Sequence, residues 1–295
     1  MAVVKANGYG NGAVRVSQAL QGPASSFAVW TEDEAAELCA NGITSDILIL
    51  GLSKHRFQKA NIVHTVFSTD EIGFVAGKRV ALKINTGMNR MGTDASDVPL
   101  LADKLMQSGC KIDSVYTHLF CSASESITRA QVKVFDDVSG GIAAKRHVAA
   151  SGALKYDFAA AYDYVRCGLA LYESAVNVTA KIIKRLAVKK GGYAGYGDKP
   201  LTMDTEIAII NIGYGDGYRQ LTAQRHVYIN GAKCKLINVC MDVSIVDVGC
   251  VRANVGDFAE ILGENISPNE LGASYMTTAY EACSFYGRVR KIYIG

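Results

Sequence analysis

Lys5 and the short motif around it offer the clearest chemistry in the sequence. The segment Ala2–Lys5 is apolar and predicts a strand, and glycines at positions 8, 10 and 12 predict a tight turn directly after it. In a barrel of parallel strands, functional groups gather at the C-terminal strand ends, so the Lys5 amine is expected to face the barrel mouth. Desolvation there lowers the pKa of an amine, and the neutral amine is the form that makes a Schiff base with a carbonyl. The alternative is a solvated strand-end lysine, and the G-x-G-x-G spacing is not that of dinucleotide-binding loops.

Further polar candidates follow two other apolar segments. The motif Lys83–Gly92 contains Arg90, whose guanidinium can hold a carboxylate through two parallel hydrogen bonds. A surface arginine is the simpler alternative. His118 comes directly after the apolar segment Ser114–Thr117, where a structural histidine is equally compatible with the pattern.

The segments after the seventh and eighth predicted strands suit a phosphate group. Loops at these places in barrels often hold phosphate through backbone N–H groups, helped by a helix N-terminus. Ser151, Gly168 and Leu169 occupy such positions. Capping of a helix is the alternative role of Ser151.

Tyrosines in glycine-rich motifs mark the second half of the chain. Tyr196 and Tyr214 lie in such motifs, Met241 lies in the segment Val239–Val243, and Tyr280 precedes Glu281. Each of these side chains could also be ordinary packing.

The first 170 residues alternate between short apolar segments and helical patterns. The predicted strands are Ala2–Lys5, Ser26–Trp30, Asp46–Leu50, Val63–Ser68, Val80–Ile84, Ser114–Thr117, Arg146–Ala149 and Tyr164–Cys167. Helices are predicted over Glu32–Ala40, with Thr31 as N-cap, and over Val98–Met106 and Ile127–Val138. Eight such alternations favour a (β/α)8 TIM-type barrel over a doubly wound open sheet.

The pattern changes after about residue 174, where strand-like segments are separated only by turns. The predicted strands are Val176–Lys184, Thr205–Ile212, His226–Ile229, Lys233–Val239, Ser244–Val248 and Phe258–Leu262. Asn230-Gly231 is a strong hairpin signal. A helix over Tyr275–Ser284 and a last strand over Val289–Ile294 are also predicted. The fold class is therefore α/β, with the barrel followed by a C-terminal β-rich domain.

Composition excludes several classes of protein. The 295 residues carry a net charge of +3 without blocks of like charge, which gives no reason to expect nucleic acid or membrane partners. The eight cysteines form no C-x-x-C pair and suggest reduced thiols, and no metal site is expected. The absence of a leader pattern or a long apolar stretch predicts a soluble cytoplasmic protein.

Read in order, these motifs resemble those of the alanine racemases, a family of pyridoxal-phosphate enzymes. The motifs are Ala2–Gly12, Lys83–Gly92, Tyr116–His118, Ser151-Gly152 with Val165–Leu169, and Ala194–Gly197 with Ile212–Tyr218 and Val239–Val243. The resemblance covers most of the chain. It implies an enzyme that interconverts L-alanine and D-alanine with pyridoxal phosphate (PLP). It also implies a PLP-binding barrel at residues 1–174 and a C-terminal β domain at residues 175–295.

The resemblance further implies roles for single residues. Lys5 forms the internal aldimine with PLP and moves the α-proton on one face of the substrate, and Tyr196 acts on the opposite face. The implied cofactor contacts are Tyr9, His118, Ser151, Arg166, Gly168, Leu169 and Tyr280, and the implied substrate contacts are Arg90, Tyr214 and Met241. Lys83 matches a lysine that is carbamylated in several members of the family and supports the arginine.

By the same resemblance, Arg166 faces the pyridine nitrogen of PLP and is hydrogen-bonded to His118. An arginine stays protonated at any relevant pH, so it cannot supply a proton to that nitrogen. Such a site favours reprotonation at Cα over transamination. The family pattern also implies a homodimer in which the second domain of one subunit covers the barrel mouth of its partner.

Three departures from the family pattern stand out. Ala150 replaces a common asparagine, Gly215 replaces an alanine, and only four residues precede Lys5 where a longer segment is usual. The last departure suggests a fragment, a wrongly assigned start or a compact variant. The open alternatives are therefore a racemase for serine or another amino acid, and an inactive truncated PLP-binding paralogue.

Overall fold

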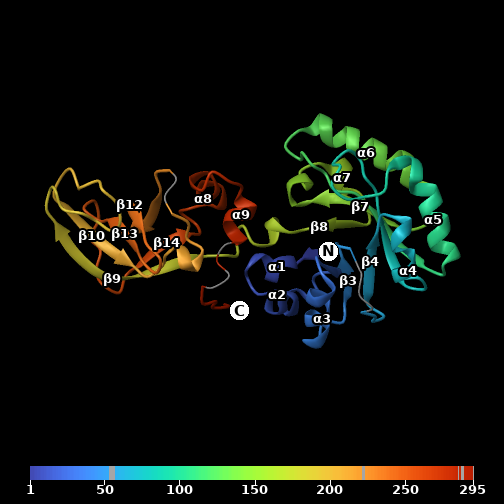
Figure 1. Cartoon of the computed structure of the whole chain (residues 1–295), viewed down its shortest axis with the longest axis horizontal. Helices are drawn as coiled ribbons and strands as arrows, with labels where there is room; N and C mark the ends of the chain where they lie inside the picture. Colours follow the sequence, from blue (N-terminus) through green and yellow to red (C-terminus); the bar gives the residue numbers. More distant parts are fainter. Residues whose placement is uncertain (53–56, 221–222, 285, 287–288, 295) are drawn as a thin grey trace. The chain divides into compact units, whose positions relative to one another are not determined.

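The computed structural model describes residues 1–52, 57–220, 223–284, 286 and 289–294. The chain divides into two compact units, Met1–Leu171 and Tyr172–Gly295. The first unit is built on parallel strands with helices between them, and the second is built mainly on antiparallel strands (Figure 1).

The first unit is an eight-stranded parallel sheet that curls into a barrel. Its strands are β1 (Ala2–Val3), β2 (Ser26–Val29), β3 (Asp46–Ile49), β4 (Ile62–Val66), β5 (Arg79–Lys83), β6 (Lys111–Tyr116), β7 (Lys145–Ala150) and β8 (Tyr164–Arg166), each paired with the next in chain order. A bridge between Ala2 and Cys167 joins the first strand to the last, and the Val3 amide donates to the Cys167 carbonyl at 2.7 Å. The predicted TIM-type barrel is thus confirmed.

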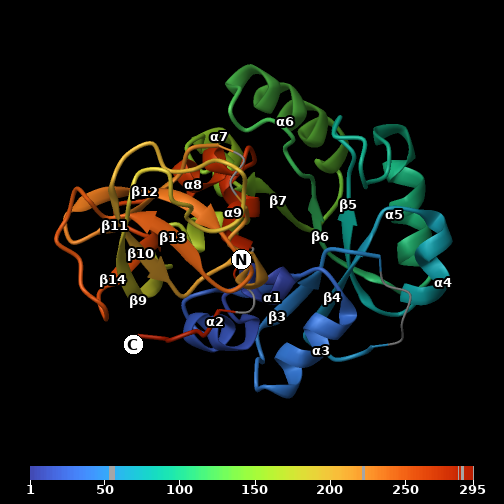
Figure 2. The ribbon, with the colours of Figure 1, turned by 60° about the vertical axis from the view of Figure 1, so that its left-hand side comes forward.

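Helices cover the outside of this barrel (Figure 2). They are α2 (Ala13–Leu20), α3 (Glu32–Ala40), α4 (Ile72–Val75), α5 (Val98–Gln107), α6 (Glu125–Ser139) and α7 (Asp157–Ala160). As predicted, α3 begins at Thr31, whose hydroxyl accepts from the Glu34 amide while the Glu34 carboxylate accepts from the Thr31 amide. This capping box satisfies donors that the first helical turn leaves unpaired. Buried apolar side chains of α5, α6 and the strands, such as Leu101 and Phe135, fill the space between the two layers.

The second unit contains a closed antiparallel barrel. Its strands are β9 (Val178–Val188), β10 (Thr205–Ile210), β11 (His226–Ile229), β12 (Ala232–Val239), β13 (Ser244–Asp247) and β14 (Phe258–Leu262), in the spatial order β10-β13-β12-β11-β14-β9. The hairpin between β11 and β12 turns through Asn230 and Gly231, both with positive φ, as the Asn-Gly pair predicts.

The C-terminal part of the second unit differs from the prediction. Two short helices, α8 (Pro268–Ser274) and α9 (Ala279–Ser284), replace the single helix expected over Tyr275–Ser284. Ser267 caps α8 and Pro268 occupies its first turn, while a φ of 54° at Met276 prevents one continuous helix. The prediction of a strand over Val289–Ile294 was wrong, because these residues pair with no strand in the described structure.

Three general properties bear on function. Among the described residues, no helix combines the length and the apolar character that a membrane crossing requires. The eight cysteines all lie in the described ranges and are free thiols. Within the same ranges, no three histidine, cysteine or carboxylate side chains gather as a metal site would require.

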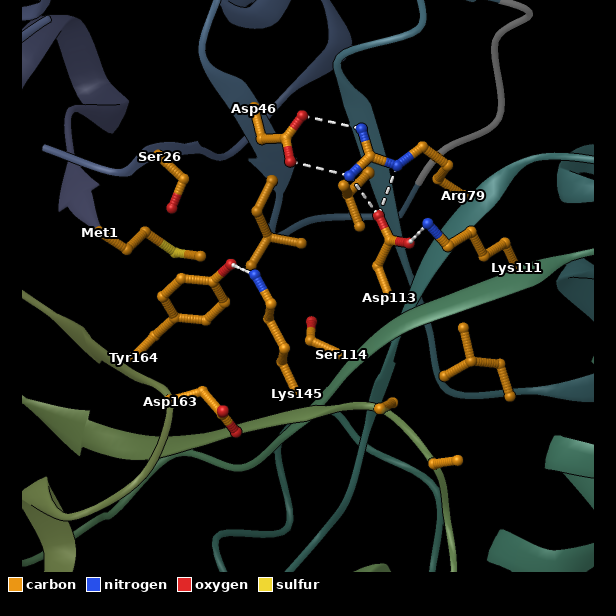
Figure 3. A pocket seen from close by; sticks show the side chains of 15 residues that line it. Met1, Ser26, Asp46, Arg79, Lys111, Asp113, Ser114, Lys145, Asp163 and Tyr164 are labelled. Carbon is orange, nitrogen blue, oxygen red and sulfur yellow. Dashed lines mark hydrogen bonds and ion pairs between the residues drawn. The ribbon is translucent and has the colours of Figure 1, made fainter. Parts of the chain in front are cut away.

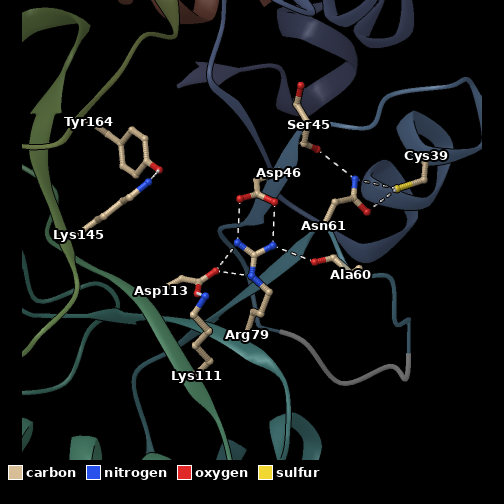
Figure 4. A network of polar contacts seen from close by, with 10 residues as sticks. All are labelled: Cys39, Ser45, Asp46, Ala60, Asn61, Arg79, Lys111, Asp113, Lys145 and Tyr164. Carbon is tan, nitrogen blue, oxygen red and sulfur yellow. Dashed lines mark hydrogen bonds and ion pairs between the residues drawn. The ribbon is translucent and has the colours of Figure 1, made fainter.

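The amino ends of the barrel strands are held by a charged cluster centred on Arg79. Its guanidinium donates to both carboxylate oxygens of Asp46 on β3, at 2.7 and 2.8 Å, and to Asp113 on β6 (Figure 4). It also donates to the carbonyl of Ala60 at 2.8 Å. One planar cation therefore joins β3, β5 and β6, as bidentate geometry allows.

A cavity of about 470 Å³ opens at this same end of the barrel. Figure 3 shows Arg79 between Asp46 and Asp113 on one side, and the Lys145 amine donating to the Tyr164 hydroxyl on the other. These residues lie at or near the first residues of their strands, whereas functional side chains of such barrels lie at the strands' carboxyl ends. The cavity is therefore separate from the candidate active site.

We expect Arg79→Met to lower the free energy of unfolding by about 1–2 kcal/mol, because it leaves the poorly exposed Asp113 without its strongest partner. Arg79 holds the pKa of Asp46 below its usual value. The added stability is thus present at neutral pH and is lost as the pH falls through the lowered pKa, below about pH 4. Urea unfolding of both proteins at neutral and acidic pH measures this. Lys133→Met, at an exposed ion pair, is the matched control, and an equal difference at all pH values would contradict the explanation.

Candidate active site

The carboxyl ends of the barrel strands bring four predicted residues into one electrostatic neighbourhood. Lys5 follows β1, Lys83 ends β5, His118 follows β6, and Arg166 ends β8. Burial lowers the pKa of Lys5, Lys83 and His118, and the positive charge of Arg90 lowers each of them further. The mouth of the barrel is therefore strongly cationic and suits a ligand with negative groups.

A turn of left-handed backbone follows Lys5. The strand ends at Val3, two residues earlier than predicted, and Ala6, Asn7, Gly8 and Tyr9 all have φ between 53° and 62°. Such a conformation costs an L-residue roughly 1–2 kcal/mol. Local hydrogen bonds offset this cost: the Gly8 amide donates to the Val4 carbonyl at 2.8 Å, and the Asn7 side chain accepts from the Ala13 amide at 3.0 Å.

Glu34 fixes the same turn from α3. One of its carboxylate oxygens accepts from the Ala6 amide at 2.7 Å, while the other accepts from the amides of Trp30 and Thr31. The capping box of α3 and the backbone beside Lys5 thus share one carboxylate.

The Lys5 amine lies 5.5 Å from the centre of the Trp30 ring. Burial lowers the pKa of Lys5, and the nearby Arg90 lowers it further, while Glu34 partly opposes them. A larger fraction of the amine is therefore neutral and nucleophilic at neutral pH than for a solvated lysine.

Tyr9, Gly168 and Ser151 form a compact cradle next to this turn. A Cβ atom at position 168 would lie 2.4 Å from the Tyr9 hydroxyl, so only glycine permits this approach. The Ser151 hydroxyl accepts from the amides of Gly168 at 2.9 Å and Ala170 at 3.2 Å. Leu169 begins the short helical turn between them. The hydroxyls of Tyr9 and Ser151 and the backbone of residues 168–170 converge here, and hydroxyl and backbone N–H groups are the donors to which phosphate groups bind.

Arg166 is buried and held as a hydrogen-bond donor in the barrel interior. Its Nη1 group donates to Nδ1 of His147 at 2.7 Å and to the His147 carbonyl at 3.0 Å. Its Nη2 group donates to the carbonyls of Thr117 at 2.5 Å and Val148 at 2.9 Å. Four of its five N–H groups are therefore used, and within the described part of the chain the Nε–H group has no partner. Burial lowers the pKa of Arg166 to about 10, which leaves it protonated at neutral pH.

His147 is the histidine partner of Arg166, in place of the predicted His118. Its Nδ1 accepts from Arg166, so its proton lies on Nε2, which donates to the Ser114 hydroxyl at 3.2 Å. The ring also stacks on Tyr116 with centroids 4.8 Å apart. The signal in the sequence for this partner is a histidine inside the apolar strand Lys145–Ala150. The described contacts include no hydrogen bond between the side chains of His118 and Arg166.

His118 nevertheless lies in the same cationic neighbourhood. Burial lowers its pKa to about 3, with further lowering from Arg166 and Arg90. Its ring is therefore neutral at physiological pH and does not act as a cation toward a ligand.

Lys83 is buried at the end of β5, with its amine 5.6 Å from the centre of the Tyr116 ring. Burial and the charges of Arg90, Arg166 and Lys5 lower its pKa to about 8. Roughly a tenth of this amine is then neutral at pH 7, far more than for a solvated lysine. A neutral buried amine among cations is suited to covalent capture of CO2.

Arg90 is presented by a loop that closes on itself. The Asn85 amide donates to the Thr93 carbonyl, and the Thr93 amide donates to the Lys83 carbonyl. The Asn85 side chain accepts from the amides of Gly87 and Asn89 at 3.1 Å. A Cβ at Gly92 would lie 2.5 Å from the Asn85 nitrogen, so glycine is required there. The arginine side chain itself is exposed at the tip.

The second unit holds the remaining candidates. The amides of Tyr214 and Gly215 donate to the carbonyls of Cys240 and Met241 at 2.9 and 2.8 Å, which brings Tyr214 and Met241 together. Tyr196 is 76% exposed and Met241 is 54% exposed. Tyr280 lies on α9, and burial raises its pKa. Three side chains predicted to face a substrate, Tyr196, Tyr214 and Met241, are therefore exposed on this unit.

Comparison with known proteins identifies the family. A model of the alanine racemase N-terminal domain matches residues 1–175, and a model of the C-terminal domain matches residues 175–293. The chain belongs to the alanine racemase family. An alanine racemase of Desulforamulus reducens is 35% identical over all of this chain and 92% of its own length.

Solved structures agree with this assignment. An alanine racemase from D-cycloserine-producing Streptomyces lavendulae has a TM-score of 0.88 at 26% identity, covering all of this chain and 90% of that one. One from Bartonella henselae, with covalently bound pyridoxal phosphate, has a TM-score of 0.87 at 27% identity, covering 99% of this chain and 92% of that one. Alanine racemases depend on PLP, and the residues of this barrel fit that group: a partly desolvated lysine, hydroxyl groups beside the backbone of Gly168, and an Arg166 Nε–H that has no partner among the described residues.

The protonation state of the buried His147 tests its hydrogen bonds with Arg166 and Ser114. Burial and Arg166 hold its pKa well below the usual value, so we expect a neutral ring with its proton on Nε2 from about pH 8 to about pH 5. Long-range ¹H–¹⁵N correlation spectra measure the state of both nitrogens, and a His147→Gln variant assigns the signals. Protonation of both nitrogens within this range would contradict the arrangement.

Proposed function

We propose that this chain interconverts L-alanine and D-alanine with PLP bound through Lys5. The observation that carries the proposal is the position of Lys5. This partly desolvated amine begins the turn whose residue Tyr9 forms the cradle with Gly168 and Ser151. Membership of the alanine racemase family supports the reaction, and the relatives' names favour alanine over serine or a longer amino acid.

Several residues of the barrel would hold the cofactor. Tyr9, Ser151, Gly168 and Leu169 would bind its phosphate, and the Lys5 amine would hold its carbonyl carbon. The Nε–H of Arg166, which has no partner in the described part of the chain, would donate to the ring nitrogen, and His118 would lie beside the ring. Tyr280 is proposed as a further phosphate contact from the second unit. When bound, PLP withdraws electrons from the α-carbon of the amino acid.

We propose that Arg166 determines whether the electron withdrawal by PLP leads to racemisation or to transamination. Its four other N–H groups are bound to acceptors, so the guanidinium is fixed as a cationic donor. It can donate a hydrogen bond to the ring nitrogen but does not give up its proton. The developing charge therefore stays near Cα, which favours return of the proton at that carbon.

Racemisation needs a proton carrier on each face of Cα. We assign these roles to Lys5 Nζ on one face and the Tyr196 hydroxyl on the other. For each direction of the reaction, one group takes the α-proton and the other returns a proton to the opposite face. Tyr214 and Met241 would bound the space for the substrate side chain, and the backbone bonds from Tyr214 to Cys240 and from Gly215 to Met241 hold their two segments together.

Arg90 would bind the substrate carboxylate, and Lys83 would support it. We propose that the neutral Lys83 amine attacks CO2, forming an N–C bond and releasing one proton. The resulting carbamate would place a negative charge among Arg90, Arg166 and Lys5. This would offset the mutual repulsion of these cations and orient Arg90.

We further propose a homodimer with shared active sites. Tyr196 and Met241 are largely exposed, as expected for side chains that a partner chain's barrel mouth would cover. One site would then combine Lys5 of one subunit with Tyr196 of the other.

The cofactor assignment is tested by borohydride reduction of the purified protein with PLP, followed by peptide mapping. We expect a visible absorbance band that reduction removes, and a pyridoxyl group on Lys5. Lys5→Ala should lose both the band and at least about a thousandfold in racemisation of alanine. A label on another lysine, or full activity of the variant, would reject the assignment. Assays with serine in parallel separate the two amino-acid substrates.

The shared site is tested by mixing two inactive variants, Lys5→Ala and Tyr196→Phe. Each heterodimer would contain one site with both native residues, so equal mixing after subunit exchange should restore about a quarter of the native activity. If both residues of a site came from one chain, mixing would restore nothing. Each variant alone gives the baseline.

A further inference from the structure

Gln131 on α6 is a buried polar side chain that faces both the Arg90 loop and the segment of His118. Gln131 is only 3% exposed, and its hydrogen bonds within the described residues all join it to uncharged groups. Its Nε2 donates to the Thr86 hydroxyl at 2.9 Å and to the His118 carbonyl at 3.3 Å. Its Oε1 accepts from the Phe120 amide at 3.1 Å. One amide group therefore connects a helix to two segments at the barrel mouth.

The hydrogen bonds from Gln131 through Thr86 and Thr117 to the Ile84 carbonyl form a series with a fixed donor and acceptor at each step. Because the Gln131 Nε2 group can only donate, the Thr86 oxygen accepts from it. The Thr117 hydroxyl donates to the Ile84 carbonyl at 2.9 Å, so in the 2.8 Å contact between the two threonines Thr86 is the donor. The Thr86 and Thr117 hydroxyls thus each donate one hydrogen bond. Loss of the Gln131 donor would leave the buried Thr86 oxygen with one bond fewer.

Thr86 is the point where the Arg90 loop is anchored to the body of the barrel. Residues 85–93 are closed by bonds within the loop, through Asn85 and Thr93. These bonds fix the shape of the loop, and the bond from the Thr93 amide to the Lys83 carbonyl ties it to the end of β5, while its orientation toward β6 and α6 depends on a further attachment at its base. The Thr86 side chain is buried and bonds to Thr117 after β6 and Gln131 on α6, which makes it that attachment.

We propose that Gln131 is a positioning residue that orients Arg90 for the substrate carboxylate and sets the backbone at His118. The proposal rests on the proposed function, since it specifies how the same site recognises a carboxylate. Gln131 touches neither substrate nor cofactor, and it acts through Thr86 on one side and through the His118 carbonyl on the other.

The test uses the PLP-loaded enzyme and two variants. Gln131→Met keeps the length of the side chain but removes every hydrogen bond, and Gln131→Glu keeps the acceptor for Phe120 while removing the donor to Thr86. We expect the KM for alanine to rise about tenfold in both, with a smaller fall in kcat, because one oriented contact to the carboxylate is weakened. Calorimetric titration with propionate, which has a carboxylate but no reactive amine, should show a similar rise in Kd.

Controls separate positioning from a loss of folding stability. Ser139→Ala removes a buried side chain of the same helix that bonds to Phe135 and Arg146, away from the mouth, and it should leave KM and propionate binding unchanged. Borohydride labelling of Lys5 should remain complete in both Gln131 variants. In an Arg90→Ala background, Gln131→Met should cause no further loss of propionate binding, because the two act on one contact.

The outcomes distinguish the two hypotheses. If native enzyme fails to racemise alanine, the proposed function is wrong, whereas calorimetry with propionate still reports on Gln131. If native enzyme is active and the Gln131 variants keep native KM and propionate Kd, or lose thermal stability alone, Gln131 has only a structural role and the inference is overturned.

Discussion

The interaction on which the barrel mouth depends is the enclosure of the Arg166 guanidinium. A buried cation without a carboxylate partner is costly unless its N–H groups find acceptors. Here three backbone carbonyls and the His147 ring supply them, from Thr117 after β6 and from two positions of β7. The same bonds fix the relative register of β6, β7 and β8 at their carboxyl ends. The groups that a cofactor meets are therefore placed by the need to satisfy one buried charge.

This charge also sets the electrostatic character of its surroundings. Arg166 lowers the pKa of Lys83 and His118, and with Arg90 and Lys5 it gives the mouth an excess of positive charge. Phosphate, carboxylate and carbamate groups would each offset part of that repulsion, so the proposed ligands would lower the excess positive charge of the site. The opposite end of the barrel contrasts with this, because Arg79 there is neutralised by Asp46 and Asp113 and needs no ligand.

Much of this architecture could be predicted from the sequence, because the determining signals are local. Eight apolar segments gave eight strands, Thr31 with Glu34 formed the expected cap, and Asn230-Gly231 formed the expected hairpin. Contacts between distant segments could not be predicted in the same way. Two such contacts are the bond between His147 and Arg166 and the bond from Gln131 to Thr86. Each joins separate elements of the barrel, and no spacing of residues in the sequence predicts either one. The break at Met276 was missed because a left-handed methionine has no composition signal.

The left-handed turn after Lys5 makes the orientation of that lysine dependent on a separate helix. Residues 6–9 together disfavour this conformation by several kcal/mol in an isolated peptide, since only Gly8 among them lacks a Cβ. The bonds that offset this cost come partly from Glu34, which is placed by α3 and its cap. The turn is therefore fully braced only where α3 is in place, and the orientation of the lysine that would hold the cofactor depends on that helix. Where the barrel is incomplete, Glu34 cannot brace this turn, and Lys5 lacks the partial burial that lowers its pKa.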